Sequence, residues 1–124
     1  GLLGHLIEMC EGSNLSAEIE YSKIPLLKNI SHYASNMIYP DITFRNWNSY
    51  EKKVSMNFAK VSNFGKVEGE AILTLCDPQT SGGLLVAVDS SYENEFIALT
   101  KKSGIDLKSF GFLKQKTSIF VTIK

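Results

Sequence analysis

With 124 residues, of which 44% are hydrophobic and 21% charged, this chain has the size and composition of one folded domain rather than of a disordered segment. Thirteen acidic and thirteen basic residues give a formal net charge of zero, which argues against binding to nucleic acid through a basic surface. The chain has no apolar run of about 18 residues and no signal-peptide pattern, so we expect a cytoplasmic protein that does not enter a membrane.

The first forty residues predict a helix, a strand and a second helix. Residues 2–11 carry apolar side chains at helical spacing, and Gly12 is placed to end this helix. Residues 16–22 alternate between apolar and polar, which predicts a half-exposed strand. Pro25 then opens the second helix. The expected buried positions are Leu3, Leu6, Ile7 and Cys10 in the first helix, Ala17, Ile19 and Tyr21 in the strand, and Leu26, Leu27, Ile30, Tyr33, Ala34 and Met37 in the second helix.

Residues 40–70 give the weakest pattern. A short helix over 44–53 would contain Trp47, the only tryptophan. The polar stretch from Asn57 to Glu70 contains two glycines, and we interpret it as a loop with one short element. Residues 71–75 are apolar but too few to distinguish helix from strand.

The last third predicts a strand, a helix and two strands. Residues 84–88 form a short run without a polar face, typical of a strand buried on both sides. Ser90 and Glu93 then have the spacing of a capping box for a helix that ends at Gly104. Strands over 110–114 and 119–123 follow, separated by a connection of hairpin length. Because helices and strands mix without strict alternation, we predict one layered α+β domain over residues 1–124.

The candidate reactive side chains form no catalytic set. Cys10 and Cys76 lie far apart and in no zinc-type spacing, so we expect two buried, reduced thiols and no metal site. His5 and Glu8 are one helical turn apart and can touch, but we favour a surface or packing role for the histidine. Glu18 and Glu20 share a strand face, where the solvated side of a sheet is the favoured interpretation.

The segment from Asp77 to Gly83 is the strongest candidate site. Gly82 and Gly83 allow backbone N–H groups to approach a ligand closely, and Thr80 and Ser81 add hydroxyls, so a phosphate or carboxylate would fit. The alternative is a tight turn into the following strand. Asp77 would bind a cation or, as we prefer, cap the N–H groups of its own loop.

Two segments, in this order, resemble signatures of the selenophosphate synthetases (selenide, water dikinases). They are Gly1-Leu2-Leu3-Gly4-His5-Leu6 and Asp77-Pro78-Gln79-Thr80-Ser81-Gly82-Gly83-Leu84-Leu85. Weaker matches lie between them, among them Asn46 within Thr43-Phe44-Arg45-Asn46. The likeness covers most of the chain, but only the C-terminal part of the family.

The resemblance implies a fold shared with aminoimidazole ribonucleotide synthetase and a role in making selenophosphate from selenide, ATP and water, with release of AMP and phosphate. Such enzymes are homodimers that use ATP and Mg²⁺. Their reactive Cys or selenocysteine, a nearby Lys and most metal-binding Asp residues belong to an N-terminal domain. The helix that starts at Gly1 without a cap also suggests a missing upstream segment. We therefore expect a C-terminal domain that binds no cofactor tightly and is inactive alone.

The resemblance also implies a division of the candidate residues. Contacts to phosphate or to the N-terminal domain are expected from Asp77, Thr80, Ser81, Gly82 and Gly83, while Gly1, Gly4 and His5 would line the cleft. Two other interpretations stay open. One is a related enzyme that phosphorylates or activates a different small molecule, and the other is a phosphate-binding or interaction module without catalytic activity.

Overall fold

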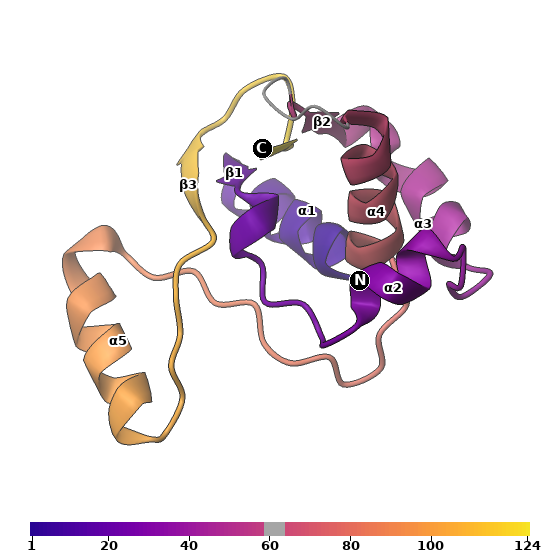
Figure 1. Ribbon diagram of the computed structural model, residues 1–124. Coiled ribbons are helices and arrows are strands. Elements are labelled where there is room, and N and C mark those ends of the chain that lie inside the picture. The colour runs from indigo at the N-terminus through magenta and orange to yellow at the C-terminus, as the bar shows by residue number, and fades with distance from the viewer. Residues whose placement is uncertain (59–63) are drawn as a thin grey trace.

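The computed structural model describes residues 1–58 and 64–124 and places a small mixed sheet beside a group of helices (Figure 1). The sheet has the strand order β2-β4-β1-β3, with β1 at Leu15–Ile19, β2 at Val54–Met56, β3 at Gly111–Gln115 and β4 at Val121–Ile123. β4 runs parallel to both β1 and β2, whereas β1 and β3 are antiparallel. The predicted α+β class is therefore confirmed.

Helix α1 (Leu2–Ser13) covers one face of this sheet, and its buried side is the predicted one. The helix ends at Asn14, whose φ of 56° lies in the left-handed region, and not at Gly12 as predicted. Asn tolerates this conformation better than most residues, so it replaces glycine as the cap. The strand face toward α1 contributes Ala17, Ile19, Val121 and Ile123, all of them buried.

The second helix is much shorter than predicted. α2 spans only Ile30–Ser35, because Asn29 before it and Met37 after it both have positive φ values and interrupt the helix. Of the predicted apolar side, Ala34 is buried, while Leu27 and Met37 are 81% and 63% exposed. Helical spacing was present in the sequence, but these two side chains stay exposed in the described structure, so their burial does not favour a longer helix.

The middle of the chain contains two helices and a strand. α3 (Thr43–Tyr50) and the short 3₁₀ turn η2 (Glu51–Lys53) confirm the helix predicted around Trp47. Strand β2 was not predicted. α4 (Phe64–Leu75) occupies much of the stretch interpreted as a loop, although that interpretation also covers residues 59–63, which lie outside the described part. Burial of Ala71 and Leu75 favours the helix despite the cost of its glycines.

The segment over 84–88 is not a strand. Its backbone forms no hydrogen bond in the described structure, and Leu84 is 93% exposed, so the prediction of a strand buried on both sides is wrong. Leu85 alone packs partly against the core. An apolar run becomes a strand only when another strand lies alongside it, and none does here.

This segment leads into the short 3₁₀ turn η3 (Ser90–Tyr92) and then into helix α5 (Glu93–Lys102). α5 stands apart from the body in Figure 1 and buries no residue. Asp89, rather than Ser90, caps this region, because its carboxylate accepts hydrogen bonds from the Ser91 N–H at 2.9 Å and from the Ser91 hydroxyl. These bonds lower the pKa of Asp89. The expected hairpin between the last two strands is also absent, since β1 lies between β3 and β4.

Candidate functional site

The two sequence motifs meet at the C-terminal end of α4. A Cβ atom added to Gly1 would lie 2.6 Å from the carbonyl oxygen of Asp77 and 2.8 Å from that of Leu75. No side chain fits there, so the backbone at Gly1 packs directly against the root of the Asp77–Gly83 loop. The N-terminus accordingly lies beside the end of α4 in Figure 1. The family resemblance implied that both segments face one cleft, and the structure brings Gly1 and Asp77 together.

Helix α3 supplies a third contact to the same root. The side-chain amide of Asn46 donates a hydrogen bond of 2.8 Å to the carbonyl oxygen of Cys76, the first residue after α4. The last carbonyls of a helix have no partner within the helix itself, so a side-chain donor at this position satisfies one of them. Asn46 thereby fixes the peptide unit from which the loop departs.

Tyr50 lies one turn further along α3 and connects it to α1 and to Cys76. A Cβ atom on Gly4 would be 3.7 Å from the Tyr50 ring, an ordinary contact, so Gly4 approaches a side chain here. Burial, and next the neighbouring Cys76 thiol, raise the pKa of Tyr50. Burial is also the main cause that raises the pKa of Cys76 to about 11. Both groups are therefore neutral near pH 7, and Cys76 is not poised as a nucleophile.

The Asp77–Gly83 loop itself is exposed from Pro78 onward. The Asp77 carboxylate accepts hydrogen bonds of 3.0 and 3.2 Å from the Gln79 side-chain amide. In the described structure it accepts none from the backbone N–H groups of its loop, which it was expected to cap. Ser81 and Gly83 have φ values of 59° and 112°, both in the left-handed region. In the described structure the hydroxyls of Thr80 and Ser81 and the N–H groups of Gly82 and Gly83 have no hydrogen-bond partner. They are free to meet an anionic ligand.

His5 does not join this group. Its ring lies on the exposed side of α1, where Nδ1 is 3.3 Å from a Glu8 carboxylate oxygen, and both side chains are more than two-thirds exposed. The predicted contact with Glu8 is confirmed. A role for His5 in a cleft stays a prediction that would require other parts of a longer protein.

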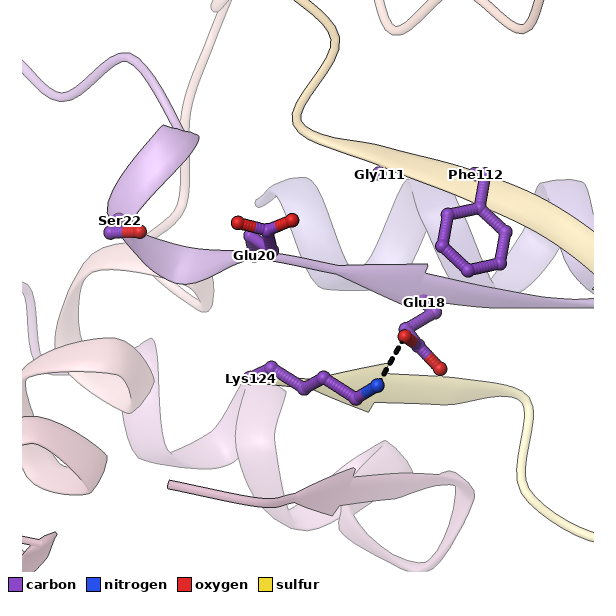
Figure 2. Close-up of a pocket in the computed structure, with 6 residues that line it drawn as sticks. All are labelled: Glu18, Glu20, Ser22, Gly111, Phe112 and Lys124. Carbon is purple, nitrogen blue, oxygen red and sulfur yellow. Dashed lines mark hydrogen bonds and ion pairs between the residues drawn. The ribbon is translucent and has the colours of Figure 1, made fainter. Parts of the chain in front are cut away.

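A separate hollow of about 270 Å³ lies on the open face of the sheet (Figure 2). Glu18, one of the residues that line it, forms ion pairs with Lys124, which directly follows β4, and, at 2.9 Å, with Lys114 on β3. Hydrogen bonds from both lysines lower the pKa of Glu18. Glu20 is paired with Lys23 at 2.8 Å. Since each carboxylate has a cation, the hollow is an ion-pair cluster that joins three strands, in keeping with the solvated sheet face predicted.

Two further observations limit the chemistry of the described residues. They hold no cluster of three or more His, Cys, Asp or Glu side chains able to bind a metal ion. They also contain no helix that is both long and apolar enough to cross a bilayer. Cys10 and Cys76 are both buried free thiols, as predicted.

The sequence predicted the Asp77–Gly83 loop as a candidate site, but it did not predict the side chains that contact the first residues of that loop. Asn46 is only a weak match to the family resemblance, and no sequence pattern assigned a role to Tyr50. A usable signal existed, because Thr43, Asn46, Trp47 and Tyr50 follow the 3.6-residue period of a helix with one inward side. Three of these four side chains are polar, which hid the pattern from a search for apolar spacing.

Comparison with known proteins shows the family to which the chain belongs. Residues 1–124 match the family described as "AIR synthase related protein, C-terminal domain". Among similar proteins, "Selenide, water dikinase" of Haemophilus influenzae is 44% identical over 124 residues, all of this chain and 33% of that protein. Proteins of the same name from Aeromonas hydrophila and Pseudomonas putida are 41% and 40% identical over 94% and 99% of the chain. The chain thus spans about a third of the length of the curated relatives it matches.

Proposed function

This chain belongs to the family of AIR synthase related proteins, whose C-terminal domain it matches throughout, and from that premise we propose that it is the C-terminal domain of a selenophosphate synthetase. The observation that carries the proposal is the similarity of 40–44% identity, spread over nearly the whole chain, to proteins named selenide, water dikinase. The complete enzyme would convert selenide, ATP and water into selenophosphate, AMP and phosphate. Its location would be the cytoplasm.

The proposed task of this domain is to complete the phosphate site. The free N–H groups of Gly82 and Gly83 and the hydroxyls of Thr80 and Ser81 are donors of the kind that stabilise phosphate oxygens. At Gly82 and Gly83 the backbone would approach a ligand without a Cβ atom in the way. Gly1 and Asp77 bring the N-terminal segment and this loop to one place, where a preceding domain of the same chain would dock.

Magnesium would supply charge neutralisation on the phosphates, as it does in phosphoryl transfer generally. The described residues do not by themselves fit such an ion, because they form no cluster of three acidic or histidine side chains, and the Asp77 carboxylate is engaged by Gln79. We therefore assign the principal magnesium ligands, and the reactive thiol or selenol, to the proposed N-terminal domain, and derive no step through the ion here. A homodimer of the complete enzyme is part of the same proposal.

The test uses the full-length protein that contains this chain. With ATP, Mg²⁺ and selenide it should release AMP, and ³¹P NMR should detect selenophosphate in equal amount. The 124-residue chain under the same conditions should release none. Release of AMP by the short chain would contradict the division of labour, and formation of a phosphorylated product from another acceptor by the full-length protein would favour a related small-molecule kinase.

A further inference from the structure

Helix α3 turns an unusually polar side toward the protein interior. Its less exposed residues are Thr43, Asn46, Trp47 and Tyr50, whereas the residues between them are exposed. The described residues offer no hydrogen-bond partner to the fully buried Thr43 hydroxyl. To the buried Tyr50 hydroxyl they offer only the neighbouring Cys76 thiol, which is a weak partner. Asn46, between them, is the polar member with a defined partner, the carbonyl of Cys76. Buried polar groups without partners are rare in folded proteins, so this side of α3 is not arranged for stability alone.

The Cys76 carbonyl lies at the position where the chain passes from helix α4 into the loop that follows. α4 is still intact at this residue, because the Cys76 N–H donates a hydrogen bond of 3.1 Å to the Ile72 carbonyl. One residue later the chain leaves the helix. From Pro78 to Gly83 it forms no hydrogen bond with any other element of the described structure. The direction of the loop is consequently set at its root, by Gly1 packing from one element and by the Asn46 amide from another.

We infer that Asn46 is a positioning residue for the phosphate-binding loop. Its amide donor holds the Cys76 peptide unit and thereby places the N–H groups of Gly82 and Gly83 where they meet the phosphates of ATP. This inference rests on the proposed function of the loop. It adds a residue that touches no ligand, lies thirty positions upstream of its target, and acts only through the backbone of Cys76.

The experiment replaces Asn46 by Asp in the full-length protein. The change conserves shape but puts a carboxylate oxygen against a carbonyl oxygen and removes the donor. We expect ATP to bind about tenfold more weakly in isothermal titration, and KM for ATP to rise by a similar factor, while KM for selenide stays within twofold. The matched control is Asn48→Asp, the same substitution at an exposed position of the same helix. It should leave both constants unchanged.

Asn46→Gln tests the same idea through partial rescue. It retains the amide donor on a longer side chain, so the loss of ATP affinity should be smaller, about threefold, and this variant serves if Asn46→Asp does not fold. Unchanged ATP binding in Asn46→Gln and Asn46→Asp would overturn the inference. So would an equal rise in both KM values with a lowered melting temperature, since that pattern marks general loss of structure.

Direct titration with ATP separates this inference from the proposed function. If the full-length protein binds ATP but makes no selenophosphate, the proposed reaction fails, and the Asn46 variants still report on the loop. If in that case Asn46→Asp weakens ATP binding and the control Asn48→Asp does not, the positioning role of Asn46 holds even though the proposed reaction fails.

Discussion

Replacing Tyr50 by Phe should leave the free energy of unfolding unchanged or raise it by about 1 kcal/mol, with an upper bound of about 3 kcal/mol. The Tyr50 hydroxyl is buried, and among the described residues it has no nitrogen or oxygen partner, while the neighbouring Cys76 thiol is at best a weak one. Phe retains the edge-to-face contact with Trp47, whose ring centre lies 6.4 Å away. The substitution therefore removes a desolvated hydroxyl and little else.

Tyr21→Phe provides the matched control, because it makes the same chemical change to a hydroxyl that does have partners. The Tyr21 hydroxyl is 3.0 Å from that of Thr74 and donates to the Glu70 carboxylate at 3.3 Å. Its removal should lower the free energy of unfolding by about 0.5–1.5 kcal/mol for each hydrogen bond lost. The two tyrosines should thus respond in opposite directions to one substitution.

Urea unfolding of the 124-residue chain measures both effects, followed by circular dichroism and by the fluorescence of Trp47. The slope of free energy against urea should stay constant among the variants, so that a shifted midpoint reports stability. A difference of 1 kcal/mol corresponds to roughly 4 °C in melting temperature for a domain of this size. A loss of 1 kcal/mol or more in Tyr50→Phe would refute the reasoning, because it would mean that the hydroxyl has a strong partner.

Four further substitutions test other parts of the structure. Gly111→Ala should cost about 1–3 kcal/mol in urea unfolding, because the added Cβ would collide with the backbone carbonyl oxygen of Glu18 and lie 2.7 Å from the Ile19 side chain. Gly69→Ala, with open space around it, should gain about 1 kcal/mol. Leu84→Asp should change the free energy of unfolding by less than about 0.5 kcal/mol, since Leu84 is 93% exposed, and a cost above 2 kcal/mol would restore the buried strand predicted from sequence. The pKa of Cys76 is raised from 9.0 to about 11, so the thiol ionises first in the unfolded state, and the free energy of unfolding should fall as the pH rises through that interval. When both proteins are unfolded in urea at about pH 8 and at about pH 11, Cys76→Ala should lose less stability than the unchanged protein, by on the order of 1–2 kcal/mol.

Local patterns in the sequence predicted the parts of the fold that local interactions determine. The inward side of α1 follows from apolar spacing within a single helix, and the structure buries the same residues. The contact between Gly1 and Asp77 was expected only through resemblance to a family. Nothing in the composition of either segment specifies that the other lies beside it.

The failures have a common physical cause, since strands and long helices depend on partners that are distant in sequence. The run after Gly83 has the composition of a buried strand, but no neighbouring strand accepts its backbone. Conversely, α4 contains two glycines and polar residues that suggested a loop, yet packing of Ala71 and Leu75 makes it a helix. The contact of Asn46 could not be predicted, because its partner is a main-chain carbonyl, and main-chain groups leave no pattern in the sequence.

The interior position of β4 has a consequence for the order in which the protein acquires its structure during synthesis. Val121 and Ile123 are fully buried, and their strand lies between β1 and β2, with β1 about a hundred residues earlier in the chain. Until the ribosome has released these residues, β1 and β2 have no strand to join them, and the part of the apolar side of α1 that packs against β4 stays uncovered. The nascent chain must therefore remain soluble with an unfinished core, and it is in this interval that chaperones would be most needed.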